Sequence, residues 1–76
     1  MQPGSTQLFS DMAGTVVEIK VQAGESIVLE QEVAVIESMK MQVPVLAPQA
    51  GRVRNVLVTV GTFVSEGTAL FELGPV

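Results

Sequence analysis

AGTVVEIKVQAG at residues 13–24 is matched 37 positions later by AGRVRNVLVTVG at residues 50–61. Both segments begin with an Ala-Gly pair and end on a glycine, and the match continues without a gap to Ile36 and Leu73. Self-similarity at a fixed offset indicates a duplicated supersecondary unit. Two copies are too few for a solenoid, so we expect a pair of units related by a pseudo-twofold axis.

Each copy has the two-residue alternation of apolar and polar side chains that is typical of a half-buried strand. The residues expected to point inward are Val17, Ile19 and Val21 in the first copy and Val56, Val58 and Val60 in the second. Val16 and Val53 are out of phase with these residues, at the same place in both copies. A shared change of phase indicates a bulge, or a corner where the strand passes between two sheets.

No segment has a convincing 3.6-residue periodicity, and glycines interrupt the apolar runs about every ten residues, as in sandwiches and barrels. We therefore predict an all-β fold, a flattened β-barrel (barrel-sandwich hybrid) of two four-stranded antiparallel sheets with an internal pseudo-twofold repeat. The strands are expected at residues 6–10, 14–22, 27–28, 32–38, 41–47, 51–60, 63–65 and 69–73. We expect a flexible lead at residues 1–7 and one domain at residues 8–74.

The composition argues against several classes of function. The chain has no cysteine and no histidine, so it lacks thiolate and imidazole metal ligands and a base that titrates near neutral pH. Its net charge of −4 disfavours binding to phosphate backbones. No apolar run approaches the roughly 18–20 residues that span a bilayer, and the N-terminus does not read as a secretory signal. We expect no catalytic residue, metal, nucleic-acid partner or membrane partner. We expect a monomer in the cytoplasm, or in the mitochondrial matrix if the chain is part of an organellar protein.

The connection between the two copies contains Glu37-Ser38-Met39-Lys40-Met41, and Lys40 is one of only two lysines in the chain. The expected flanking strands leave only Met39 and Lys40 for the turn. A two-residue hairpin turn requires positive φ and favours pairs such as Asn-Gly. Two bulky residues in that geometry cost on the order of 1–3 kcal/mol each. A chain selected for stability alone would carry glycine there, so the side chains themselves must be required.

Taken singly, these residues have ordinary interpretations. Lys40 alone would be a solvated surface lysine, and Met39 and Met41 alone would be gap-filling core residues. Their combination with an unfavourable turn at the centre of a duplicated β domain favours a modification site at the Lys40 amine.

The same five residues resemble the attachment motif of biotinyl domains, the biotin carboxyl carrier family, whose usual form is Glu-Ala/Ser-Met-Lys-Met. The resemblance covers about residues 8–73 and includes the Ala-Gly turn at 13–14 and the related glycine turns at 24–27 and 61–67. It implies a lysine at an exposed hairpin opposite the chain termini. It implies that Lys40 carries covalent biotin, attached by a biotin protein ligase through a biotinoyl-adenylate. The residues that the ligase would recognise are Glu37, Ser38, Met39 and Met41.

The resemblance further implies a non-catalytic carrier that moves an activated carboxyl group between biotin carboxylase and carboxyltransferase domains or subunits. Three positions depart from the usual pattern. Glu30 replaces a common glycine and matches Gly67 in the second copy, so it is strained if the backbone there is left-handed. Asp11 replaces a common proline, and Thr62 replaces a usual aspartate. All three concern the stability of turns.

Two other functions remain open. A lipoyl carrier shares the fold and uses a lysine at the same tip, but its usual motif is Asp-Lys-Ala/Val. Met39 and Met41 disfavour that alternative. An unmodified barrel-sandwich interaction module would need an extended exposed apolar patch, which the sequence does not indicate. An independent enzyme is the least favoured reading, because a suitable base is missing.

Overall fold

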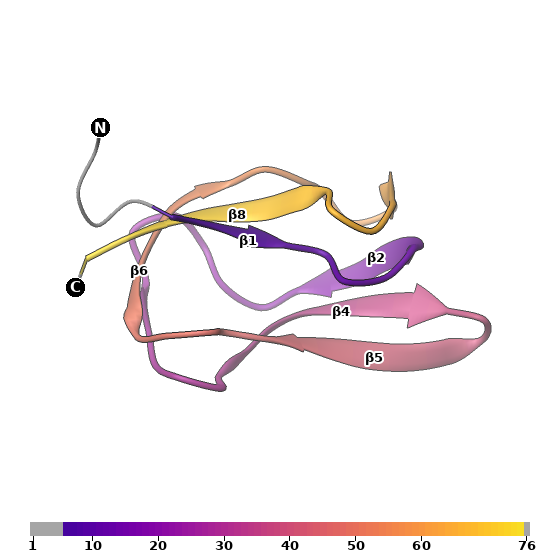
Figure 1. Cartoon of the computed structure of the whole chain (residues 1–76), viewed down its shortest axis with the longest axis horizontal. Coiled ribbons are helices and arrows are strands. Elements are labelled where there is room, and N and C mark those ends of the chain that lie inside the picture. Colours follow the sequence, from indigo (N-terminus) through magenta and orange to yellow (C-terminus); the bar gives the residue numbers. More distant parts are fainter. Residues whose placement is uncertain (1–5, 76) are drawn as a thin grey trace.

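A computed structural model describes residues 6–75, which contain eight strands and no helix. One antiparallel sheet has the order β1 (Thr6–Phe9), β8 (Ala69–Gly74), β6 (Gly51–Val56) and β3 (Ser26–Ile27). The other has the order β5 (Met41–Leu46), β4 (Glu32–Ser38), β2 (Gly14–Ile19) and β7 (Phe63–Val64). The two sheets lie one above the other (Figure 1). The predicted all-β fold of two four-stranded antiparallel sheets is confirmed. Within residues 6–75 no strand pairing joins one sheet to the other, so the two sheets form a flattened sandwich and not a closed barrel.

The offset of 37 residues relates the two sheets strand by strand. A shift of 37 residues superposes the range of β2 on β6, of β3 on β7 and of β4 on β8, and it superposes β1 on the end of β5. The strand order of one sheet is therefore equivalent to that of the other. The hydrogen bonds follow the same rule. The Gly24 N–H donates to the Val53 carbonyl at 2.7 Å, and the Gly61 N–H donates to the Val16 carbonyl at 2.7 Å. The internal repeat is therefore a repeat of structure as well as of sequence.

The change of phase predicted at Val16 and Val53 is a real irregularity of the ladders. Pairing shifts between Val16 and Glu18 in β2, and between Val53 and Asn55 in β6. A bulge bends its strand and increases the local twist. Both strands therefore turn toward the opposite sheet at equivalent points.

This bend explains where the expected strands 14–22 and 51–60 were too long. Pairing continues for a short stretch past each bulge, and β2 then ends at Ile19 and β6 at Val56, where the chain leaves its own sheet and crosses toward the other. Val60 lies in the turn before Gly61 and is 60% exposed, so its expected inward position was wrong. Val58 remains packed against the core.

Two of the three departures at turns have clear structural outcomes. Glu30 has a φ of 68°, so the left-handed backbone inferred from its match to Gly67 is present. The Thr62 side chain accepts a backbone hydrogen bond within its turn, as the side chain of its counterpart Glu25 does. The Thr62 hydroxyl oxygen accepts a bond from the Thr59 N–H at 3.4 Å, and the Glu25 carboxylate accepts one from the Gln22 N–H at 3.0 Å.

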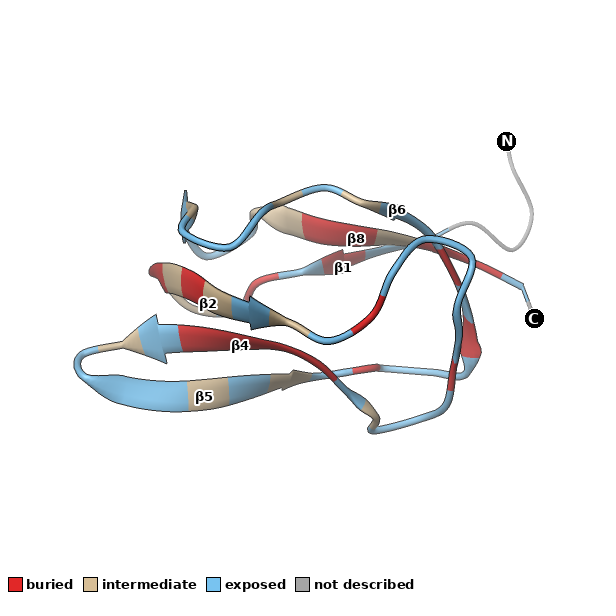
Figure 2. Cartoon of the chain, turned by 180° about the vertical axis from the view of Figure 1, so that it is seen from behind, coloured by how far each residue is buried: buried red, intermediate tan, exposed pale blue. Residues whose placement is uncertain are grey.

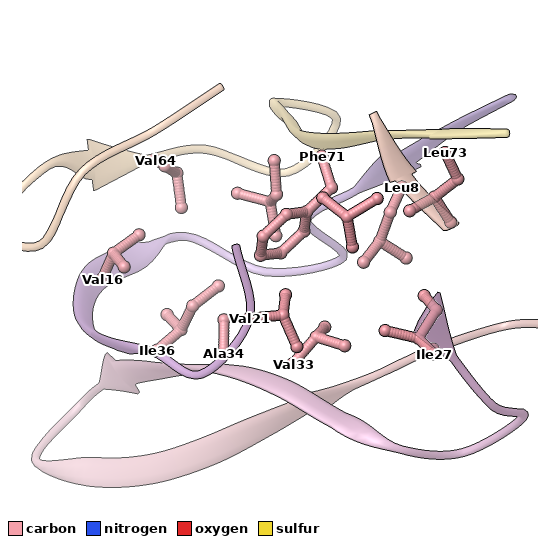
Figure 3. Close-up of a cluster of buried hydrophobic side chains, with 13 residues drawn as sticks. Leu8, Val16, Val21, Ile27, Val33, Ala34, Ile36, Val64, Phe71 and Leu73 are labelled. Carbon is pink, nitrogen blue, oxygen red and sulfur yellow. The ribbon is translucent and has the colours of Figure 1, made fainter. Parts of the chain in front are cut away.

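The space between the sheets holds one hydrophobic core, to which both copies contribute matching residues (Figure 3). Its largest fully buried side chains are Phe71, Ile27, Ile36, Leu70, Leu73, Val16, Val33, Val53 and Val64. Burying one such side chain contributes about 1.5–3 kcal/mol. Buried positions run along β4 and β8 (Figure 2), so the core anchors β4 up to the base of the β4–β5 hairpin.

The hairpin between β4 and β5 protrudes at one end of the long axis, while β1 begins and β8 ends at the other (Figure 1). The principal extents are 36 × 22 × 17 Å. β1 begins at Thr6, within the lead expected over residues 1–7, and the other residues of that lead lie outside the described range. No helix that could cross a membrane occurs between residues 6 and 75.

Candidate functional site

The β4–β5 hairpin closes through a turn of two residues. Ser38 and Met41 are the last paired residues, which leaves Met39 and Lys40 between the strands. Their φ angles are 53° and 67°. Positive φ at both central positions defines a type I′ turn, whose twist matches that of the flanking strands. The turn register and the left-handed backbone inferred from the sequence are both confirmed.

All the side chains of this tip stand outside the core. Met39 is 93% exposed and Met41 is 66% exposed, so neither methionine fills a gap in the interior. Lys40 is also exposed and forms no ion pair with any residue between 6 and 75. The chain's other lysine differs, because the Lys20 Nζ lies 3.4 Å from the Glu32 Oε1. The Lys40 amine is therefore accessible to another molecule.

A left-handed backbone at non-glycine residues is uncommon in the described part of this chain. Among residues 6–75, the non-glycine residues with positive φ are Glu30, Met39 and Lys40. The other such positions are occupied by glycine, at residues 24, 61 and 67. Each non-glycine residue of this kind costs on the order of 1–3 kcal/mol and persists where the surrounding structure holds it. Two of the three are adjacent and lie at the tip, which supports a role for their side chains.

A close approach of two strands supports the base of the hairpin. A Cβ atom added to Gly14 would lie 2.5 Å from the Glu37 carbonyl oxygen and 2.7 Å from the Ile36 Cγ2. β2 can therefore pass β4 at this point only with glycine. Gly14 was expected at the start of a strand, at the Ala-Gly turn, and this close contact was not predicted. The available signal was the repeat, since a Cβ atom on the matching Gly51 would lie 2.6 Å from the Gly74 carbonyl oxygen.

The remaining residues of the predicted motif lie directly below the turn. Glu37 pairs with Gln42 on β5 and with Thr15 on β2, and it is exposed on the outward face, next to the inward Ile36. Ser38 is half-buried. The structure thus brings the five residues 37–41 together at one protruding end.

This tip is a protrusion and not a cleft. A groove of about 300 Å³ lies between β1 and β5, and none of residues 37–41 lines it. Its walls are Leu8, Phe9, Asp11, Met12 and residues 43–46. No group of three or more His, Cys, Asp or Glu side chains between residues 6 and 75 is placed to hold a metal ion. The Lys40 side chain is therefore exposed on a protrusion and does not line this groove.

Comparison with known proteins gives a consistent family relationship. Residues 6–73 match the family model described as "Biotin-requiring enzyme". The biotin/lipoyl attachment protein of Bacillus subtilis is 47% identical over 62 residues, which cover 82% of this chain and 85% of that protein.

Longer proteins contain a similar segment. The mitochondrial propionyl-CoA carboxylase alpha chain of Sus scrofa is 42% identical over 69 residues, 91% of this chain. The dihydrolipoyllysine-residue acetyltransferase component of the pyruvate dehydrogenase complex of Azotobacter vinelandii is 42% identical over 62 residues, 82% of this chain. The chain spans 10% of the length of each. The solved structure of a single-chain, multi-domain long-chain acyl-CoA carboxylase superposes with a TM-score of 0.91 at 37% identity, covering all of this chain and 8% of that one.

Proposed function

Because this chain belongs to the family of biotin/lipoyl attachment domains, we propose that it is a carrier whose Lys40 is covalently biotinylated. The observation that supports this most directly is the position of Lys40. It lies at the centre of a strained, exposed turn at the end of the molecule opposite β1 and the end of β8. In this proposal the carrier serves a biotin-dependent carboxylase and catalyses no step itself.

The tip has the properties that an amide-linked group requires. Among residues 6–75 no carboxylate pairs with the Lys40 amine, so the amine can form an amide without first breaking an ion pair with any of them. In the proposed reaction the Lys40 Nζ attacks the acyl carbon of a biotinoyl-adenylate held by the ligase. The N–C bond forms, the bond from that carbon to the AMP oxygen breaks, and the proton lost from the nitrogen passes to a group of the ligase. Glu37, Met39 and Met41 flank the amine with exposed side chains that the ligase can contact.

The rest of the domain presents and confines the modified lysine. When bound, biotin supplies a ureido nitrogen that can take up and release a carboxyl group. The β-sandwich keeps Lys40 on a rigid support, so movement is confined to the lysine side chain and to whatever links the domain to its partners. Tethering replaces a diffusive encounter by a local one and raises the effective concentration of the carried group at each partner site. Those sites would be a biotin carboxylase and a carboxyltransferase.

Biotin is favoured over lipoate by the residues on either side of the lysine. Lipoyl motifs usually carry an acid before the lysine and a small residue after it, whereas this tip exposes Met39 and Met41. Two of the similar proteins are named as acyl-CoA carboxylases. The similarity to a dihydrolipoyllysine-residue acetyltransferase component supports the lipoyl alternative. The experiment must therefore distinguish biotinylation from lipoylation.

The test is intact-mass measurement after incubation with biotin protein ligase, ATP and biotin, and separately with lipoate ligase, ATP and lipoate. We expect one biotinyl increment on the parent chain and on Lys20→Arg, and none on Lys40→Arg. Because Lys20 and Lys40 are the only lysines, these variants assign the increment to one side chain. An increment with lipoate ligase alone would establish the lipoyl carrier. No increment with either enzyme would leave the unmodified interaction module.

A further inference from the structure

One row of side chains crosses the whole outward face of the sheet that carries the hairpin. Phe63 on β7 pairs with Thr15 on β2, Thr15 pairs with Glu37 on β4, and Glu37 pairs with Gln42 on β5. Residues directly opposite each other in antiparallel strands project from the same face. Val64 is fully buried, so its neighbour Phe63 faces outward with the rest of the row. We call these four residues the outward row.

Phe63 is the unusual member of this row, because its ring is 66% exposed. Strands of one sheet lie about 4.8 Å apart, so two strand spacings place Phe63 roughly 10 Å from Glu37. Glu37 in turn lies three residues before Lys40. An exposed aromatic side chain therefore shares a face, and one end of the molecule, with the proposed attachment site.

The second copy shows that the fold does not need an aromatic residue here. The row equivalent to Phe63, Thr15 and Glu37 consists of Ser26, Arg52 and Gly74, paired in the same way. The backbone is thus compatible with serine at the position of Phe63 and with no side chain at the position of Glu37. The aromatic residue and the carboxylate are therefore present in the row that borders the hairpin and absent from the equivalent row. Packing of the sandwich does not account for either of them.

We propose that the outward row, with Phe63 as its apolar anchor, is the surface on which the enzyme that acylates Lys40 docks. This inference rests on the proposed function of Lys40. A specific interface buries about 800 Å² on each partner, which is more than a two-residue turn can supply, so the enzyme must also cover a neighbouring surface. Aromatic residues are enriched among those that dominate binding energy, and Phe63 offers such a residue on the adjoining face.

The chemistry of the row specifies the partner surface. It requires an apolar pocket for the Phe63 ring and, about 10 Å away, a cationic or hydrogen-bond-donating group for the Glu37 carboxylate. The same surface must leave the Lys40 side chain free to enter the acylation site. Phe63 would act by positioning the carrier and would not touch the reacting atoms, so its loss should weaken binding and spare the chemical step.

The test is steady-state kinetics of biotin protein ligase with the parent, Phe63→Ser, Phe63→Tyr and Val28→Ser. Phe63→Ser installs the residue of the equivalent position, so the fold is expected to survive, which an unchanged thermal melt verifies. Val28 is the matched control. It is 62% exposed, its equivalent is Ser65, and it follows β3 on the opposite sheet. We expect the KM for the carrier to rise about tenfold in Phe63→Ser with kcat unchanged, and to stay within twofold of the parent in Phe63→Tyr and Val28→Ser.

The outcomes separate this inference from the proposed function. A Phe63→Ser variant labelled with the parental KM overturns the docking role alone, because the parent still acquires biotin on Lys40. If the same variant then fails with biotin carboxylase, the row belongs to that partner instead. An equal rise of KM in Val28→Ser also overturns the proposal, since it would show a general response to lost apolar surface. A parent that acquires no group overturns both.

Discussion

Glu30 and Gly67 occupy equivalent positions in the two halves of the molecule and share a left-handed backbone, with φ angles of 68° and 90°. The Glu30 N–H donates to the Ala47 carbonyl at 2.8 Å, and the Gly67 N–H donates to the Ser10 carbonyl at 2.7 Å. The same bond is therefore made twice, once with a relaxed residue and once with a strained one. No side-chain hydrogen bond of Glu30 within the described residues offsets the difference.

Replacing Glu30 by glycine should stabilise the domain. A non-glycine residue in this region costs about 1–2 kcal/mol, and the added chain entropy of glycine returns part of that, about 0.5–1 kcal/mol. We expect a net gain of about 0.5–1 kcal/mol in the free energy of unfolding, or a rise in Tm of a few degrees for a domain of this size. Calorimetry or chemical denaturation measures it. Gly67→Glu is the reciprocal control and should lose stability, and a lower Tm for Glu30→Gly would contradict the assignment of strain.

Gly14→Ala tests the close packing of β2 on β4. The new Cβ would meet the Glu37 carbonyl oxygen at 2.5 Å, and backbone atoms cannot move aside as a flexible side chain can. We expect a loss of about 1–3 kcal/mol, as for other overpacked sites, measured by chemical denaturation. Gly24→Ala is the comparison, because open space surrounds a Cβ there and only the left-handed backbone is penalised. Equal stability of Gly14→Ala and the parent would show that β2 can shift freely.

Much of this fold follows from the 37-residue offset and the two-residue alternation. They predicted the strand at 32–38 with both its ends, and the neighbouring strand start at 41. These two boundaries alone define the turn at Met39 and Lys40, because no other residue lies between them. The motif then identified which side chains belong to the tip.

What the sequence missed has a physical cause. Alternation continues past the bulges into residues that no longer belong to a sheet, so Val60 was assigned an inward position that the crossing chain does not give it. Phe63 was not identified as a site residue, because an apolar residue next to the buried Val64 is common in strands. The exposure of Phe63 and its alignment with Glu37 become evident only when the pairing of three strands is known. A local sequence pattern does not give that pairing. The expectation of no extended exposed apolar patch did not concern single exposed side chains such as Phe63.

Met39→Asp should separate recognition from folding. The side chain is 93% exposed, so the change removes no buried contact and should leave the free energy of unfolding within about 0.5 kcal/mol of the parent. It introduces a charge beside the amine that the ligase must approach, and we expect biotinylation to slow at least tenfold. Labelling kinetics by intact mass give the measurement. Unchanged kinetics would mean that the ligase does not read Met39, and Met39→Leu is the control that keeps the apolar surface.

The double variant Met39→Asn, Lys40→Gly should be more stable than the parent and incapable of carrying a group. Asn-Gly is the preferred pair for a type I′ turn, whereas the native turn holds a methionine and a lysine at φ angles of 53° and 67°. Relieving this strain should raise the free energy of unfolding by about 1–2 kcal/mol, measured by denaturant titration, while intact mass shows no increment with ligase. Lys40→Arg is the matched control, because it also loses the acceptor amine but keeps a bulky residue, so its stability should equal that of the parent. A double variant no more stable than Lys40→Arg would mean that the tip stores no strain. Backbone strain would then no longer indicate that the Met39 and Lys40 side chains are retained for function.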